Sequence, residues 1–260
     1  MNRVGQGLIA LVVAAFLMLP LLVILPLAFN SGWLLSYPMT GFSLQWFKDL
    51  VLNPSWRLAV SNSIIIGLGS AGLATVLGTL AAMGLRSKTG VLYRIIAGIF
   101  VLPMIVPIVL VGVGMQITFA PIGLTNGYAG VIIGHAVISV PFVVASVLAS
   151  LSGINPQLER AAASLGANPL AVFRAVTFPL AMPGVISGAV FALAVSFDEV
   201  VVTLFLAGPN QRTVAREIFA QMRDNLTPTI AAVAFIFIIA TICVGVLSLI
   251  LSNRKDLYVK

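Results

Sequence analysis

The sequence predicts an all-α membrane protein with six transmembrane helices. The first observation behind this fold class is composition, because 60% of the 260 residues are hydrophobic and only 8% are charged. A typical soluble domain has about 45–50% apolar and about 25% charged residues. The second observation is that the apolar residues are gathered into long runs separated by short polar segments. A soluble enzyme, a disordered protein and a nucleic-acid-binding protein are therefore excluded.

Each expected span is an apolar run long enough to cross the hydrocarbon core, which takes about 20 residues of helix. The first run is interpreted as an uncleaved span, because it is longer than the apolar part of a signal peptide. In the third run, Pro103 and Pro107 predict a kink, since each proline leaves a backbone carbonyl without its donor. The runs form one membrane domain of residues 1–260, at about 8–29, 58–85, 91–117, 127–151, 185–206 and 228–251.

The basic residues predict that both termini lie in the cytoplasm. With six spans and an inner N-terminus, nine basic residues fall inside: Arg3, Arg86, Lys88, Arg94, Arg160, Arg174, Arg254, Lys255 and Lys260. Five fall outside: Lys48, Arg57, Arg212, Arg216 and Arg223. The positive-inside rule favours this orientation. The three tryptophans then belong to the first outer region, where we expect them at the membrane interface.

Small residues recur every four positions in the second span. Ala74, Gly78 and Ala82 share one helix face, where another backbone can approach closely. This face suits either an interface between subunits or packing within the chain.

The sequence contains no pattern of residues that is typical of catalysis or metal binding. No lysine follows a glycine, so a phosphate loop of the form G-x-x-x-x-G-K-[ST] is excluded. The single histidine, His135, lies inside the fourth span and is expected to form hydrogen bonds between helices. The single cysteine, Cys243, permits no disulfide within the chain. We therefore expect no enzymatic activity, no metal and no cofactor in this chain itself.

The inner loop at 152–184 has the pattern of two short helices. Good helix formers lead up to Gly166, which suits a helix C-terminus with positive φ. Asn168 and Pro169 start a second helix over 170–176, and Pro179 is expected to end it. Such a loop is a rigid projection that can push on a partner.

This loop resembles the E-A-A-x-x-x-G-x₉-I-x-L-P segment of permease subunits in binding-protein-dependent ABC importers. Ala161, Ala162 and Gly166 match its spacing, and Pro179 matches its last position. One departure is that Arg160 occupies the place of the glutamate, with Glu159 one residue earlier. The resemblance implies a type I ABC importer permease bundle, in which this loop forms coupling helices that seat on an ATP-hydrolysing subunit. The implied ATPase-coupling residues are Glu159, Arg160, Ala161, Ala162, Gly166 and Pro179.

The end of the fifth span points to a class of importer. The stretch Phe197-Asp198-Glu199-Val200-Val201, like most of the chain, resembles the second permease subunit of spermidine/putrescine importers. Related permeases for other small organic solutes share this stretch. The resemblance implies a polyamine solute, with an amino-acid-like or opine-like solute as the alternative. A self-sufficient secondary transporter fits less well, because the sequence has no internal repeat.

Asp198 and Glu199 are the charged residues that we place inside the bilayer. Charged groups there are costly and usually face a cavity or a partner. A carboxylate can meet an ammonium group on a substrate pathway, or it can serve a structural or gating role. Adjacent helix positions point about 100° apart, so we expect one of the two to face the pathway.

The resemblance also implies the surroundings of the chain. The expected partners are an ATP-binding subunit in two copies, a second homologous permease, a solute-binding protein on the outer side and membrane lipid. ATP and Mg would be bound by the ATPase partner, and nucleic acid is not expected. The implied location is the bacterial inner (cytoplasmic) membrane, with the chain crossing it several times.

Overall fold

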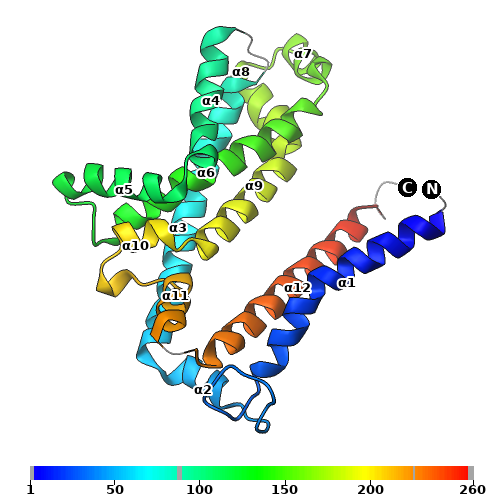
Figure 1. Cartoon of the computed structure of the whole chain (residues 1–260). Helices are drawn as coiled ribbons and strands as arrows, with labels where there is room; N and C mark the ends of the chain where they lie inside the picture. Colours follow the sequence, from blue (N-terminus) through cyan, green and yellow to red (C-terminus); the bar gives the residue numbers. More distant parts are fainter. Residues whose placement is uncertain (1–2, 87–89, 225, 257–260) are drawn as a thin grey trace. The chain divides into compact units, whose positions relative to one another are not determined.

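The computed structural model describes residues 3–86, 90–224 and 226–256 (Figure 1). Within these ranges the elements are helices, apart from one isolated β-bridge between Asn30 and Phe42. The all-α prediction is therefore confirmed for the described residues. The α-helices are α1 Arg3–Leu27, α2 Gln45–Leu52, α3 Pro54–Leu85, α4 Val91–Ile105, α5 Ile108–Phe119, α6 Tyr128–Ser152, α7 Pro156–Ser164, α8 Pro169–Val172, α9 Phe178–Asp198, α10 Val201–Leu206, α11 Val214–Asp224 and α12 Thr229–Asp256.

Several helices are long and apolar enough to cross a membrane. In the described part of the chain there are four, at Gly5–Leu27, Pro54–Leu85, Tyr128–Ser152 and Pro169–Asp198. The pair α4 and α5 makes a fifth if it counts as one broken span. The part of α12 whose side chains the structure describes, Thr229–Ile242, is apolar but shorter than a full span. A count of six therefore stays a prediction.

The third expected span is broken much more sharply than a kink. Val91–Ile105 and Ile108–Ile122 meet at 106° (Figure 1). Pro107 has no N–H to continue the helix and disfavours helical geometry in the residue before it. Val106 is accordingly extended, with φ −71° and ψ 133°. The interruption predicted for the third span is therefore found, but it is a sharp bend at Pro107, whereas Pro103 lies inside α4.

The fifth span also differs from its expected bounds. Its helix, α9, begins at Phe178 and ends at Asp198, and α10 follows after a two-residue break. Pro179 does not end a helix, because it lies in the first turn of α9, directly after a π-helical turn. The chain runs from α8 into α9 through a π-helical turn, Phe173–Thr177.

The described chain divides into two compact units. The first comprises Met1–Arg57 and Ala220–Lys260, and in it α12 contacts α1 and α2. Its core includes Leu27, Trp46 and Ala231. Of the three tryptophans expected at the membrane interface, Trp33 is 77% exposed, whereas Trp46 and Trp56 are buried.

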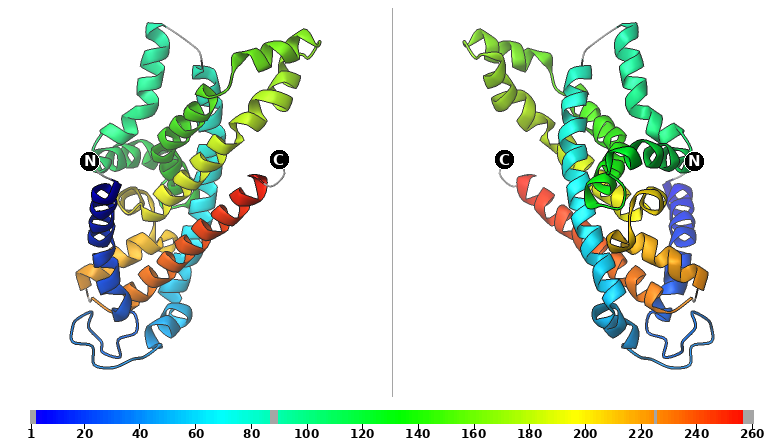
Figure 2. Two further views of the ribbon diagram at one scale, coloured as in Figure 1. Left: turned by 90° about the vertical axis from the view of Figure 1, so that its right-hand side faces the viewer. Right: turned by 90° about the vertical axis from the view of Figure 1, so that its left-hand side faces the viewer.

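The second unit, Leu58–Phe219, is built around α6 and α9, which lie side by side (Figure 2). Glycines allow their close approach. A side chain at Gly184 would collide with Ser150 and with the carbonyl of Ser146. On α3, Gly78 packs against Val143 of α6 in the same way, and its neighbours Ala74 and Ala82 are fully buried. The small-residue face of the second span therefore serves packing within the chain.

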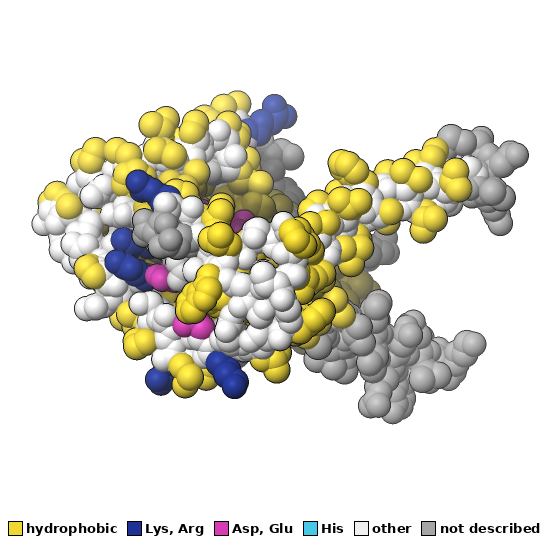
Figure 3. Space-filling view, turned by 60° about the horizontal axis from the view of Figure 1, so that its bottom comes forward, with side chains coloured by type: hydrophobic (Ala, Val, Ile, Leu, Met, Phe, Trp, Pro, Cys, Tyr) yellow, Lys and Arg dark blue, Asp and Glu magenta, His cyan; other side chains and the backbone are white. Residues whose placement is uncertain are grey.

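Large apolar side chains cover much of the surface. On α1, Leu11 is 68% and Phe16 is 75% exposed. Figure 3 shows hydrophobic side chains spread widely over one face, with few charged ones among them. This surface suits a lipid environment rather than water.

Candidate functional site: the inner loop and the broken fifth span

The first short helix of the inner loop, α7, is capped at both ends. At its start, the Asn155 side chain accepts a hydrogen bond of 2.9 Å from the backbone N–H of Gln157. At its end, Gly166 has φ +88°. The N–H of Gly166 bonds to the Ala163 carbonyl, and that of Ala167 bonds to the Ala162 carbonyl. This pattern is the Schellman motif, so the conformation expected of Gly166 is confirmed.

The second short helix, α8, restarts the chain where the sequence predicted it. The Asn168 side chain accepts a hydrogen bond of 2.8 Å from the N–H of Ala171, and Pro169 is the first helical residue. The π-helical turn Phe173–Thr177 then joins α8 to α9 without an intervening loop. The α7–α8 projection is therefore joined to the fifth span by continuous helical backbone.

Glu159 points inward and ties three elements together. Its Oε1 accepts hydrogen bonds from Nη1 of Arg86, at 2.5 Å, and from the hydroxyl of Thr177, at 2.6 Å. Arg86 follows the last residue of α3, and Thr177 ends the π-helical turn. The hydrogen bond from Thr177 and the nearby Arg86 guanidinium hold the pKa of Glu159 below its usual value, although partial burial opposes them.

The other expected coupling residues lie outside this cluster. Arg160, Ala161 and Gly166 are exposed on the projection, Ala162 is half-buried, and Pro179 is exposed at the start of α9. The structure thus turns Glu159 toward its own chain and leaves Arg160 on the surface. Sequence reasoning missed Arg86 and Thr177, because nothing in the sequence signals a contact across 73 residues.

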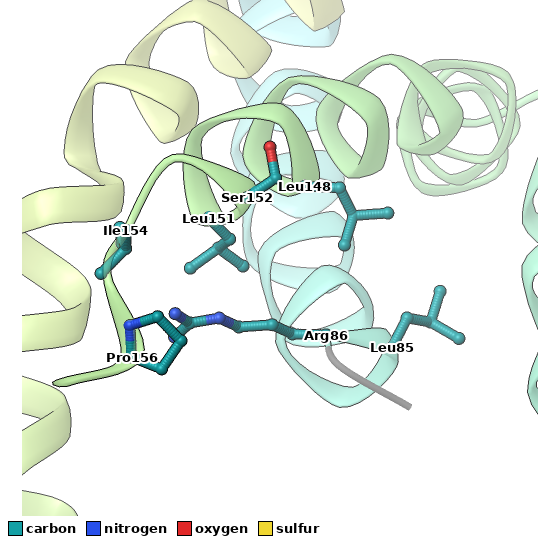
Figure 4. A pocket seen from close by; sticks show the side chains of 7 residues that line it. All are labelled: Leu85, Arg86, Leu148, Leu151, Ser152, Ile154 and Pro156. Carbon is teal, nitrogen blue, oxygen red and sulfur yellow. The ribbon is translucent and has the colours of Figure 1, made fainter. Parts of the chain in front are cut away.

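Two cavities flank the cluster. One, of about 260 Å³, is lined by residues from the ends of α3 and α6 and from the segment that leads to α7. Figure 4 shows Arg86 reaching across it from the end of α3 toward Pro156. The other, of about 390 Å³, lies between α7 and α8 and is lined in part by Glu159 and Thr177. Open space therefore lies on both sides of the Glu159 contact.

The acids of the fifth span stand at the break between α9 and α10. Asp198 is the last residue of α9 and is exposed, whereas Glu199 is half-buried with an extended backbone. The Glu199 carboxylate accepts a hydrogen bond of 2.7 Å from the N–H of Val202 in the first turn of α10. The structure brings neither acid near the inner-loop cluster, so there are two separate candidate sites.

His135 of α6 lies beside this break and is fully buried. One ring nitrogen, Nδ1, is 2.8 Å from Oγ of Ser196, and the other, Nε2, is 2.9 Å from Oγ1 of Thr203. The hydrogen bonding between helices that was expected of His135 is confirmed. Among the residues that the structure describes, no three or more His, Cys, Asp or Glu side chains group in a way that could hold a metal ion.

Comparison with known protein families decides the class of this chain. The family described as "Binding-protein-dependent transport system inner membrane component" matches residues 74–256, well over half of the chain. The chain belongs to this family. Both candidate sites lie inside the matched region, and the family's inner-membrane location agrees with the several long apolar helices.

Relatives with assigned functions match along nearly the whole chain. The spermidine/putrescine permease PotC of Haemophilus influenzae is 28% identical and covers 94% of this chain and 95% of its own. The putrescine permease PotI of Escherichia coli is 29% identical, covering 93% and 88%. The putative 2-aminoethylphosphonate permease PhnV of Salmonella paratyphi A is 30% identical, covering 90% of each. These relatives are transport permease subunits.

The fold has a counterpart among solved structures. A bacterial ABC transporter for the import of the polysaccharide alginate contains a chain that matches with a TM-score of 0.65. The match covers 97% of this chain and 98% of the other, at 14% identity. The ABC importer permease fold that the resemblance implied is thereby confirmed at the level of the fold.

Proposed function

We propose that this chain is the transmembrane permease subunit of an ATP-driven importer that carries a polyamine, such as putrescine or spermidine, into the cytoplasm. The observation that supports a polyamine as the solute is the similarity to PotC along 94% of the chain. The capped projection that runs on into α9 supports the coupling role. The family name supports an importer that works with a solute-binding protein.

In this proposal the chain itself is not catalytic. Two copies of an ATP-binding subunit hydrolyse ATP with Mg, and their closure moves the α7–α8 projection. The movement reaches α9 through the π-helical turn, and it reaches the end of α3 through the hydrogen bonds of Glu159. A second homologous permease completes the pathway, a solute-binding protein delivers the solute outside, and both termini lie in the cytoplasm.

The acids of the fifth span support a cationic solute. A carboxylate inside a membrane protein is costly unless it faces a cavity, water or a counter-charge. Asp198 is exposed at a helix break, which suits a place on a pathway that forms between two permease subunits. An ammonium group of a polyamine can be accommodated there briefly.

Another small organic solute is the second candidate. PhnV, at 30% identity, is named for a solute that is not a polyamine, so family likeness extends to other solutes. An amino-acid-like or opine-like solute would use the same importer architecture. A secondary transporter would need no ATPase, and it finds less support in the family description.

Uptake by the purified complex tests the proposal. The chain is co-purified with its co-expressed ATPase and second permease, reconstituted in proteoliposomes and supplied with its solute-binding protein. We expect ATP-dependent uptake of labelled putrescine or spermidine that unlabelled polyamine competes away and an amino acid does not. ATP-dependent uptake of an amino acid alone would contradict the polyamine assignment, and polyamine uptake without any ATPase would contradict the importer class.

A further inference from the structure

A buried histidine, His135, bonds to both sides of the break in the fifth span, and the proposed function gives it no role. We propose that His135 is a positioning residue for transport: by bonding to both sides of the break, it fixes the orientation of the two acids, with Glu199 capping α10 and Asp198 turned outward. This inference rests on the proposed function, because it assigns the roles of residues on the same pathway.

The hydrogen bonds of His135 straddle the break. Ser196 lies two residues before Asp198, and Thr203 lies four residues after Glu199. The Thr203 hydroxyl also donates to the backbone carbonyl of Glu199, at 3.0 Å. With the Thr203 hydrogen assigned to the Glu199 carbonyl, Nε2–H of His135 donates to Thr203, and Nδ1 accepts from the Ser196 hydroxyl. A neutral histidine in one tautomer thereby satisfies both helices.

The helix that carries His135 is itself fixed against α9. The Ser139 hydroxyl donates to the His135 carbonyl, at 2.7 Å, and lies 3.4 Å from the Ala192 carbonyl of α9. Nearby, Gly134 lets Val202 and Leu206 of α10 approach α6 closely. The ring therefore has little freedom, and both helix ends are held at a defined separation.

The consequence for the acids follows from the break geometry. The Glu199 carboxylate is occupied, because it accepts a hydrogen bond from the N–H of Val202 in the first turn of α10. Asp198 lies on the exposed face of α9 together with Ser187, Phe191 and Ala194, opposite the face that packs on α6. Loss of the His135 bonds would let α10 rotate, and position 198 would lose its defined orientation.

The test uses two variants that remove the bonds in different ways. His135→Phe keeps an aromatic ring but removes both hydrogen bonds. Thr203→Val keeps the side-chain shape but removes one of them, together with the bond from Thr203 to the Glu199 carbonyl. The control is Ser70→Ala, since Ser70 is also fully buried in a span but bonds only to its own helix, at the Gly67 carbonyl. Each variant is compared with the parent as an assembled complex, after its yield and ATPase association are measured.

The first readout is polyamine uptake. We expect His135→Phe and Thr203→Val to raise the apparent KM about tenfold, with a smaller change in maximal rate, whereas Ser70→Ala changes little. In an Asp198→Asn background the same substitutions should add almost nothing, because the residue through which they act is already gone. Equal losses in both backgrounds would overturn the positioning role.

The second readout does not depend on the solute. Asp198→Cys, in a Cys243→Ser background, is treated with a cationic thiol reagent and its rate of modification is measured. We expect His135→Phe and Thr203→Val to slow or accelerate this reaction at least severalfold, and Ser70→Ala to leave it unchanged. An unchanged rate in both break variants would overturn the inference, even if the parent complex proved to carry another solute.

Discussion

The turn that ends α7 in the inner loop depends on the backbone conformation of one residue, Gly166. Its φ of +88° is in the left-handed region, and a Cβ added there would meet no atom within 4 Å. Any cost of a larger residue at this position is therefore a backbone cost, of about 1–2 kcal/mol. The two Schellman hydrogen bonds that end α7 depend on that backbone conformation.

We expect Gly166→Val to uncouple ATP hydrolysis from uptake while the chain still inserts in the membrane. A β-branched residue resists positive φ, so the turn between α7 and α8 would change direction. Gly166→Asn is the matched control, because asparagine tolerates this conformation, and it should keep most of the activity. The measurement is solute taken up per ATP hydrolysed; normal coupling in Gly166→Val would refute the coupling role of the loop.

A second prediction at the scale of residues concerns the ion pair of Glu159 and Arg86. Glu159→Ala or Arg86→Ala should lower uptake per ATP severalfold, because the link from α7 to the end of α3 is lost. The exchanged pair, Glu159→Arg with Arg86→Glu, should recover part of the loss. Arg160→Ala is the control for charge on the exposed side of the same helix and should act only through ATPase binding. An exchange no better than the single variants would show that the pair itself is not required.

The pH dependence of this contact has a defined sign. The pKa of Glu159 is lowered in the folded protein, so its contribution to stability is fully present above the ordinary value of 4.5. It is lost only as the pH falls through the lowered pKa. Uptake per ATP should therefore show no step from Glu159 between about pH 5.5 and 8.

At the scale of helices, local signals were read correctly from the sequence. Gly166 and the pair Asn168-Pro169 mark a helix end and a helix start through their own backbone preferences, and both are found where expected. Long apolar runs likewise identify spans, because length and hydropathy are properties of the segment alone.

The breaks and the long-range contacts could not be read in the same way. Val106 and Pro107 signal an interruption, but its angle of 106° depends on how α4 and α5 pack. The break after Asp198 has no proline or glycine, and its polar groups are satisfied by Val202 nearby and by His135, more than 60 residues away. Such contacts follow from tertiary packing, which one sequence does not display.

Pro179 shows how a local rule can fail. A proline usually stops a helix, yet here it falls in the first turn of α9, directly after a π-helical turn. The expected loop between the second short helix and the fifth span is therefore absent from the described structure, and a continuous helix replaces it. In the proposed function, this continuity lets α9 receive the movement of the projection directly.

At the scale of the whole molecule, the proposed function requires that the α7–α8 projection and α11 lie on opposite sides of the membrane. The distribution of basic residues, nine against five, supports this arrangement. The ATPase must reach Arg160 from the cytoplasm, and the solute-binding protein must approach from the other side. If the projection and α11 lay on the same side of the membrane, the projection could not couple to a cytoplasmic ATPase while α11 faces the solute-binding protein.

Two-sided labelling tests this requirement most directly. Single cysteines replace Arg160 and Arg223, both exposed, in a Cys243→Ser background, and an impermeant thiol reagent is applied to intact and to permeabilised cells. Arg223 is preferred to Arg216, whose guanidinium bonds to the carbonyls of Ala207 and Gly208. We expect labelling of the cysteine at 223 in intact cells and of the cysteine at 160 only after permeabilisation. Labelling of both from the same side would contradict the proposed topology.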